Sequence, residues 1–300
     1  MRVYAKKPYL CGMQTVKSIR NNIVERLTPH VGNAEAQAMA RVILEDVAHV
    51  DRNKMIINPE YALEDETAAR IDRIVCRVAA GEPLQYVLGE AMFMGMRLRV
   101  TPDTLIPRPE TAGLVDMITD AYRDAKDLRI IDIGTGSGCI ALALARALSY
   151  CRVVAADVST EALAVAADNI AALRVTNVKC LNVDALCMPT PDEPLYDIIV
   201  SNPPYVTEAE RSDMDRRVLD FEPATALFVP DDDPLRFYRA IAVYGTKALT
   251  AGGSLFFEIN PLYATQLSEM LTTLGYTEVE IRRDYKGKLR YAVCRCPENR

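Results

Sequence analysis

The sequence has few of the side chains that build metal sites and disulfide frameworks. It contains two histidines, His30 and His49, and no C-x-x-C pair. Structural zinc needs clustered Cys or His ligands, and a disulfide framework is typical of short secreted chains with paired cysteines. We therefore expect neither, and we interpret most of the eight cysteines as buried small hydrophobes: Cys11, Cys76, Cys139, Cys151, Cys180, Cys187, Cys294 and Cys296.

Excess positive charge and long apolar runs are also missing. Lys and Arg number 35 against 41 Asp and Glu, which gives a net charge of −6. Proteins that bind nucleic acid usually carry a basic surface, so a nucleic-acid substrate is disfavoured, although an average can conceal a basic patch. No run approaches the ~18 apolar residues of a membrane helix, and the first residues lack the apolar core of a secretory signal. We expect a cytoplasmic protein without a membrane span.

The first 80 residues have the periodicity of helices. Apolar residues recur every three to four positions from Val16 to Leu27, where Pro29 is expected to end the helix, and again from Met39 to Val47. A third helical stretch is predicted to open at Asn58-Pro59, and Gly81-Glu82-Pro83 stops it. These stretches predict a small helical bundle, followed by a short hairpin around Phe93 to Val100.

Strands and helices alternate after residue 107, which predicts an α/β fold around a mostly parallel sheet. The expected strands are 129–133, 152–157, 178–183, 196–201 and 254–259, with 278–283 and 290–296 as an antiparallel pair at the end. The expected helices run from the Pro107-Arg108-Pro109 segment to about Arg123, and over 139–148, 162–173, 235–249 and 263–274.

A glycine-rich turn follows the first of these strands. Ile133 leads into Gly134-Thr135-Gly136-Ser137-Gly138, and a helix follows. Glycine lets the backbone turn tightly and lets a ligand approach it, while the helix start offers free N–H groups. The spacing G-x-G-x-G misses the G-x-G-x-x-G of dinucleotide sites and matches the turn on which methyltransferases hold the methionine part of S-adenosylmethionine.

Two acidic residues end the next strands. Asp157 is placed to accept hydrogen bonds from both ribose hydroxyls. The alternative role for Asp157 is to cap the following helix, but Ser159 is the better residue for that position. Asp184 is expected near the adenine, with a solvated strand-end acid as the nearly equal alternative.

The fourth strand ends in Ser201-Asn202-Pro203-Pro204-Tyr205. The Asn202 side-chain oxygen and the Pro203 carbonyl can each accept one N–H of a planar amide or exocyclic amine, which directs the nitrogen lone pair toward a methyl donor. Tyr205 offers a face for a flat group, and two prolines stiffen the loop. No general base is required, because the nitrogen becomes acidic after transfer.

At this point the sequence resembles the bacterial release-factor glutamine methyltransferases, which modify the Gln of the Gly-Gly-Gln loop in peptide-chain release factors. The resemblance covers nearly the whole chain from about residue 15. It rests on GEPLQYVLG at 81–89, TLIPRPET at 104–111, DIGTGSGCIALALA at 132–145, SNPPY at 201–205, FEPATAL at 221–227 and RDYKGKLR at 283–290. It departs from the family at Asn260, since Glu258-Ile259 is usually followed by glycine. The residues before the resemblance look like an extension.

The resemblance implies a class I, Rossmann-like methyltransferase fold: a mostly parallel seven-stranded sheet with an antiparallel terminal strand, preceded by a small α-helical domain. It implies a helical substrate-gripping domain at 1–83, a hairpin linker at 84–106 and a catalytic domain at 107–300. Carried over, the cofactor S-adenosylmethionine is bound by Gly134, Thr135, Gly136, Ser137, Gly138, Asp157, Asp184, Ala185 and Asn202. Asn202, Pro203, Pro204 and Tyr205 hold the glutamine, and Asn202, Pro203 and Tyr205 are the expected catalytic residues.

Three questions stay open at this level. The Asn-Pro-Pro-Tyr motif is shared with methyltransferases that act on adenine or guanine amino groups in nucleic acid, and this is the alternative function. A binding module without activity on the same fold is a further alternative, which intact Gly134, Asp157 and Asn202 disfavour. Arg108 is either a rigid lead into its helix or a contact to the cofactor carboxylate, and Glu222 either anchors a loop or contacts substrate.

Overall fold

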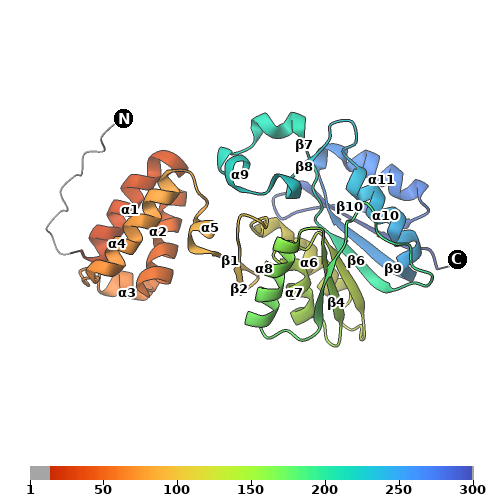
Figure 1. Ribbon diagram of the computed structural model, residues 1–300, viewed down its shortest axis with the longest axis horizontal. Coiled ribbons are helices and arrows are strands. Elements are labelled where there is room, and N and C mark those ends of the chain that lie inside the picture. Colours follow the sequence, from red (N-terminus) through yellow and green to blue (C-terminus); the bar gives the residue numbers. More distant parts are fainter. Residues whose placement is uncertain (1–13, 299–300) are drawn as a thin grey trace. The chain divides into compact units, whose positions relative to one another are not determined.

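The computed structural model describes residues 14–298 (Figure 1). The chain divides into two compact units, and the boundary in the sequence lies between Leu88 and Gly89. The N-terminal extension and Cys11 lie outside the described residues. None of the helices within this range is long and apolar enough to cross a membrane. The division falls inside the segment expected to link two domains, and the hairpin belongs to the second unit. The boundaries at 83 and 106 stay predictions.

The first unit consists of helices packed on one apolar core, which includes Ile23, Leu27, Ile43, Leu44 and Ile71. Its elements are α1 (Val16–Val31), α2 (Asn33–Ala48), α3 (Arg52–Ile57), α4 (Asp65–Ala79) and α5 (Leu84–Leu88).

Two expectations about these helices are wrong. Pro29 does not end α1, because it lies in the last turn and the helix closes only at Gly32, whose N–H donates to the Thr28 carbonyl. Asn58-Pro59 does not open a helix. The carbonyls of Pro59 and Tyr61 instead accept the N–H groups of Lys17 and Val16 at 2.9 Å, so this segment satisfies the otherwise free donors at the start of α1.

The second unit begins with a hairpin, β1 (Glu90–Phe93) and β2 (Met96–Arg99), and continues as an α/β sandwich. Its main sheet has seven strands in the order β10-β11-β9-β6-β3-β4-β5, in which β11 is antiparallel to both neighbours. The strands are β3 (Arg129–Ile133), β4 (Arg152–Asp157), β5 (Val178–Asn182), β6 (Tyr196–Ser201), β9 (Leu249–Glu258), β10 (Thr277–Arg283) and β11 (Leu289–Arg295). The fold expected from the resemblance is confirmed.

Helices cover both faces of this sheet (Figure 1). One face packs against α6 (Pro109–Ala121), α7 (Cys139–Ala147) and α8 (Thr160–Ala172) through residues such as Ile130 and Val200. The other packs against α10 (Arg236–Ala248) and α11 (Ala264–Thr273) through residues such as Ile131 and Ile199. Alternate residues of β3 and β6 therefore serve opposite cores, which explains why their sequences are apolar throughout.

Some details differ from the sequence analysis. β9 begins at Leu249 instead of Ser254, because the strand runs through Gly252-Gly253 with an irregularity: its pairing with β6 jumps from Tyr196↔Leu249 to Ile198↔Ser254. The cysteines are buried less often than expected. Cys151, Cys294 and Cys296 are buried, whereas Cys76, Cys180 and Cys187 are exposed.

The order of the strands creates a switch point between β3 and β6. From β3 the chain proceeds outward through β4 and β5, and then returns to the other side of β3 as β6. Ile133 pairs with Ala156 on one side and Ser201 on the other, so the carboxyl ends of all three strands lie level. Open α/β sheets bind ligands in this position.

The segment after β6 forms an irregular layer beside these strand ends. A short strand pair, β7 (Val206–Thr207) and β8 (Phe228–Val229), encloses the 3₁₀ helix η1 (Glu208–Asp213), the helix α9 (Arg216–Phe221) and the 3₁₀ helix η2 (Ala224–Ala226). A further 3₁₀ turn, η3 (Pro261–Tyr263), follows β9.

Candidate functional site

The glycine-rich turn after β3 has the conformation that its sequence predicts. Gly134, Gly136 and Gly138 have φ values of 75°, 55° and 82°, in the left-handed region that favours glycine. The N–H groups of Gly134 and Thr135 donate to the Ala156 carbonyl at 2.8 and 2.9 Å. The turn is therefore fixed to the end of β4 before α7 begins at Cys139.

Asp132 supports this turn from inside the sheet, and the sequence analysis overlooked it. One carboxyl oxygen accepts the Thr135 hydroxyl at 2.6 Å and the Ala141 N–H at 3.2 Å, which ties the turn to the first residues of α7. Burial raises the pKa of Asp132 to about 7. The available signal was a charged residue in the middle of the apolar run Ile130-Ile131-Asp132-Ile133, because an acid there needs local hydrogen-bond donors.

Asp157 lies at the end of β4, facing the same turn. Its two oxygens accept the N–H groups of Gly136 at 2.9 Å and of Ser159 at 3.0 Å. Ser159 caps α8 by accepting the Ala162 N–H at 3.0 Å, as expected. Each carboxylate oxygen can accept more than one hydrogen bond, so Asp157 can hold the turn and still accept hydroxyl groups from a ligand.

Asp184 and Ala185 follow β5 and line the same cavity as the glycine turn. β5 ends at Asn182, so Asp184 belongs to the loop, where it accepts the Leu186 N–H at 2.8 Å. Ala185 packs on the apolar core beside Val183.

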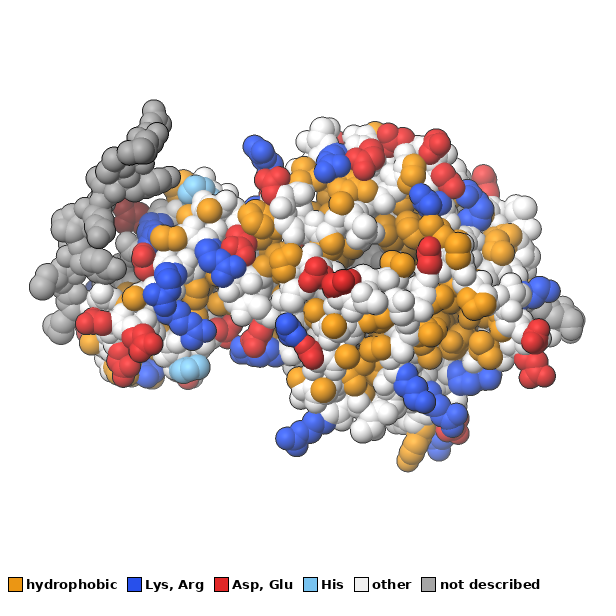
Figure 2. All heavy atoms as spheres, viewed as in Figure 1, with side chains coloured by type: hydrophobic (Ala, Val, Ile, Leu, Met, Phe, Trp, Pro, Cys, Tyr) orange, Lys and Arg blue, Asp and Glu red, His pale blue; other side chains and the backbone are white. Residues whose placement is uncertain are grey.

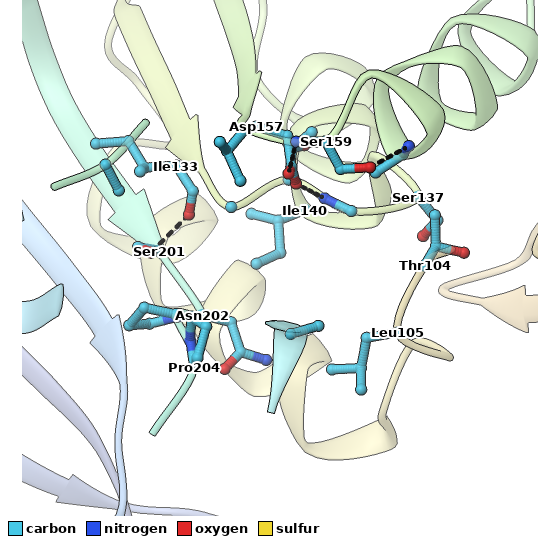
Figure 3. A pocket seen from close by; sticks show the side chains of 18 of the residues that line it. Thr104, Leu105, Ile133, Ser137, Ile140, Asp157, Ser159, Ser201, Asn202 and Pro204 are labelled. Atoms are coloured by element: carbon cyan, nitrogen blue, oxygen red, sulfur yellow. Dashed lines mark hydrogen bonds between the residues drawn. The ribbon is translucent and has the colours of Figure 1, made fainter. Parts of the chain in front are cut away.

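The last residue of β6 is hydrogen-bonded to β3, the strand that leads into the glycine turn. The Ser201 hydroxyl donates to the Ile133 carbonyl at 2.6 Å (Figure 3). A Cβ added to Gly134 would lie 3.9 Å from the main-chain oxygen of Asn202, which shows how closely the two loops approach. The Asn202 side chain points into the cavity, on the side opposite Asp157 (Figure 3).

Tyr205 is hydrogen-bonded to Glu258, the last residue of β9. Its hydroxyl donates to the Glu258 carboxylate at 3.3 Å, and the Thr111 hydroxyl donates to the other oxygen at 2.7 Å. Burial raises the pKa of Glu258, and the Thr111 hydrogen bond and the positive charge of Arg290 oppose that rise. Burial also raises the pKa of Tyr205, so its hydroxyl stays protonated and acts as a donor.

Asn260, the departure from the family pattern, is part of the same support. Its side-chain amide donates to the Tyr205 carbonyl at 3.0 Å and to the Glu210 carboxylate at 2.8 Å. Its side-chain oxygen accepts the Leu262 N–H at 3.0 Å. Asn260 therefore joins the end of β9 to η1 and to the loop Asn202–Tyr205, which is called the acceptor loop below.

Arg108 and Glu222 join two other loops. The Arg108 guanidinium donates to one Glu222 oxygen at 2.6 Å, and the Ile106 N–H donates to the other at 3.3 Å. Glu222 thus joins the segment before α6 to the segment after α9, which is the anchoring contact that the sequence analysis considered.

These residues surround two adjoining cavities. The first is lined by the glycine turn, by Asp157, Asp184 and Ala185, and by Asn202, Pro203 and Pro204. The second is lined by Leu105, Arg108, Asn202, Tyr205, Val206, Met214, Val218, Ala226 and Leu227. Leu105, Arg108, Asn202 and Ala226 belong to both. Every predicted site residue except Gly138 therefore lines one of these cavities, and Tyr205 lines only the second. Gly138 instead lies against the helices, since a Cβ added to it would be 3.4 Å from the side chains of Ala166 and Leu142.

The first cavity suits a nucleoside that carries an amino-acid tail. Its lining includes the apolar side chains of Val158, Val183 and Ile241, which suit a flat adenine ring. The carboxylate of Asp157 suits a ribose diol, and the glycine turn lets a tail approach the backbone. The groups expected to hold S-adenosylmethionine are therefore present together. Among the described residues there is no cluster of His, Cys, Asp and Glu able to hold a metal ion.

Two family models match the chain. The PrmC N-terminal domain matches residues 19–89, and the methyltransferase small domain matches residues 111–221.

Curated relatives align over most of the chain. A release factor glutamine methyltransferase of Bacteroides thetaiotaomicron is 44% identical over 254 residues, which are 85% of this chain and 90% of the relative. The enzyme of the same name from Flavobacterium psychrophilum is 36% identical, over 91% of this chain and 96% of its own. That of Francisella tularensis is 38% identical, over 81% and 85%.

Solved structures with lower identity share the fold. The hMettl16 catalytic domain in complex with MAT2A 3'UTR hairpin 1 has a TM-score of 0.58 at 18% identity, covering 87% of this chain and 90% of that one. A methyltransferase from Pyrococcus furiosus has a TM-score of 0.50 at 17% identity, covering 78% of this chain and all of that one.

Proposed function

Because the chain belongs to the release factor glutamine methyltransferase family, we propose that it methylates the side-chain amide nitrogen of the Gln in the Gly-Gly-Gln loop of peptide-chain release factors. The methyl donor is S-adenosylmethionine. Since this substrate belongs to translation termination, we propose the cytoplasm as the compartment in which the enzyme acts.

One observation carries the proposal: the glycine turn after β3 and the Asn202–Pro204 loop after β6 line the same cavity. Ser201 bonds directly to Ile133, so the two loops are fixed relative to each other. A donor and an acceptor bound to them would be held at close range, and such positioning accounts for a large part of catalysis in group transfer.

The residues around the glycine turn bind and orient the methyl donor. We assign the ribose hydroxyls to Asp157, the adenine to the surroundings of Asp184 and Ala185, and the methionine part to residues Gly134 to Gly138. S-adenosylmethionine, when bound, supplies a methyl group on a positively charged sulfur. Asp132 keeps the turn in shape through Thr135 and Ala141.

The acceptor side activates an unreactive nitrogen. In a carboxamide the nitrogen lone pair is delocalised into the carbonyl. The Asn202 side-chain oxygen and the Pro203 carbonyl can accept the two N–H groups and stabilise positive charge that develops on the nitrogen. Tyr205, fixed by Glu258 and Asn260, offers its ring to the flat amide.

The net charge of −6 and the side chains on the visible face (Figure 2) favour a protein substrate over nucleic acid. On the face shown in Figure 2, Lys and Arg side chains of the described residues are scattered among acidic and apolar ones and form no continuous basic surface. Phosphate backbones are normally bound by such a surface. The fold itself does not decide between the two, since related structures occur with RNA.

We propose that the helical first unit helps to bind the release factor. In this division of the chain, residues 1–83 grip the substrate, 84–106 form a linker and 107–300 form the catalytic domain. Its α3 carries Ile56 and Ile57, which are 68% and 82% exposed. Apolar side chains this exposed are candidates for a protein contact.

The test is methyl transfer from labelled S-adenosylmethionine to a purified release factor, with the modified residue located by mass spectrometry. We expect the label on the Gln of the Gly-Gly-Gln loop and none on a release factor in which that Gln is replaced by Ala. DNA and ribosomal RNA are assayed in parallel. Label on either nucleic acid, with an unmodified release factor, would contradict the proposal.

A further inference from the structure

The second cavity has an apolar lining with one cation. Tyr205, Val206, Met214, Val218 and Leu227 form its walls away from the glycine turn. Arg108 is the charged residue among the described residues that line it. Arg108 and Asn202 both line the first cavity as well, so Arg108 is available to a group that lies in the second cavity and extends to Asn202.

Glu222 fixes the position of that guanidinium. The Glu222 side chain is 2% exposed, whereas that of Arg108 is 33% exposed. One edge of the guanidinium is therefore bound to a buried carboxylate, while part of the group stays accessible. A guanidinium has five N–H donors on a rigid plane, so a single ion pair leaves donors for a ligand.

The charge balance indicates what kind of ligand these donors take. Glu222 already neutralises the one cation, and the surrounding walls are apolar. A phosphate would require additional positive charge to offset its desolvation, because burying an uncompensated charge is costly. A neutral carbonyl oxygen has no such requirement and is a good acceptor for a guanidinium N–H. The cavity therefore suits a peptide backbone better than a nucleotide.

We propose that the second cavity binds the peptide backbone next to the acceptor glutamine, and that Arg108, held by Glu222, donates a hydrogen bond to a main-chain carbonyl of that peptide. The inference rests on the proposed function and assigns an additional substrate-binding residue to it. Arg108 is then a contact of the acceptor and not of the cofactor carboxylate.

The experiment compares Arg108→Gln and Glu222→Gln with the wild-type enzyme, using a full release factor as substrate. Loss of one hydrogen bond to a charged donor predicts a rise of about tenfold in the KM for the release factor with Arg108→Gln. The dissociation constant for S-adenosylmethionine, measured by calorimetry, is expected to stay within about twofold. Arg129→Gln is the matched control, because it breaks another ion pair, with Asp197, at the amino-terminal ends of β3 and β6, away from the strand ends that carry the site.

Glu222→Gln separates binding from folding. If Glu222 acts by holding Arg108, its substitution raises the same KM, and the double variant is no worse than Arg108→Gln alone. A purely structural role predicts a lower thermal unfolding temperature with an unchanged KM. Arg108→Lys keeps a cation beside Glu222 and is expected to restore folding stability but only part of the affinity for the release factor.

Two results would overturn the inference. One is a loss of S-adenosylmethionine affinity in Arg108→Gln with an unchanged KM for the release factor, which would place Arg108 on the donor side. The other is no change in either quantity. Both are read against a wild-type enzyme that methylates the release factor, whereas failure of the proposed function shows itself in the wild type.

Discussion

The side-chain amide of Asn260 donates a hydrogen bond to the main-chain oxygen of Tyr205 at 3.0 Å. The family pattern given in the sequence analysis has glycine at this position, so Asn260 adds a side-chain hydrogen bond to the acceptor loop that this pattern does not predict. The same amide reaches Glu210, which accepts the Thr207 N–H and so fixes the start of η1. Asn260 thereby couples the acceptor loop to the irregular layer beside it.

Asn260→Ala is expected to lower kcat more than it weakens cofactor binding. It leaves the Tyr205 carbonyl and the Glu210 carboxylate without this donor. The loss destabilises the ordered conformation of the acceptor loop by about 1–3 kcal/mol. We expect a fall in kcat of about tenfold, measured under saturating release factor. Asn177→Ala is the control, because that amide also donates to main-chain carbonyls, those of Ala145 and Cys151, away from the site. Equal losses of kcat in both variants would refute a positioning role.

Asn202→Ala tests the catalytic assignment. Removing a positioned acceptor from the site is expected to cost about 3 kcal/mol in the barrier, or roughly a hundredfold in kcat. The dissociation constant of S-adenosylmethionine should change little in comparison. A collapse of cofactor affinity with kcat preserved would show that Asn202 serves the donor.

Asp157→Asn tests the ribose assignment. The asparagine retains one acceptor oxygen but loses the charge and one of the two acceptor sites now used by Gly136 and Ser159. Cofactor affinity, measured by calorimetry, is expected to fall by at least about tenfold. If the dissociation constant equals that of the wild type, Asp157 does not contact the cofactor.

Asp132 predicts a pH dependence of stability. Its pKa is raised to about 7 by burial, above its usual value near 3.8. Between these values the folded protein retains a proton that the unfolded chain has released, so stability falls as pH rises through this window. The slope attributable to this group is about 1.4 kcal/mol per pH unit.

Urea unfolding checks this prediction against Asp132→Asn, which cannot titrate but keeps an acceptor for Thr135. The stability of the wild type relative to the variant should decrease from about pH 5 to about pH 7 and then level off. A constant difference over this range would mean that Asp132 is already ionised.

Ile57→Asp tests the proposed grip of the first unit. Ile57 is 82% exposed, and α3 has no buried residue, so the substitution should leave folding intact. We expect a higher KM for a full release factor and an unchanged KM for a short Gly-Gly-Gln peptide. Identical behaviour toward both substrates would remove α3 from the contact.

The sequence was sufficient for the fold of the second unit because its strands are short apolar runs separated by helical periodicity. The sites on the strand ends were equally visible, since Gly134 and Asn202 each follow a parallel strand of the sheet and Asp157 ends another. Their shared cavity follows from the order of the strands.

Interactions between distant segments were not visible in the sequence. Asn260 reads as a loop residue, and only the folded chain brings it to Tyr205, 55 positions earlier. Glu222 and Arg108 are separated by 114 positions, and no local pattern links them. In the first unit, Asn58-Pro59 has the composition of a helix start, but the carbonyls of Pro59 and Tyr61 accept N–H groups at the start of α1, a contact that periodicity cannot report.

The central claim is that the donor turn and the acceptor loop act on one bound pair of ligands. A crystal structure with S-adenosylhomocysteine and a Gly-Gly-Gln peptide tests it most directly. We predict the adenosine beside Asp157 and the glutamine amide on Asn202 and Pro203, with its nitrogen facing the sulfur across the shared cavity. A glutamine bound elsewhere, or an amide whose nitrogen is turned away from the sulfur, would contradict the account.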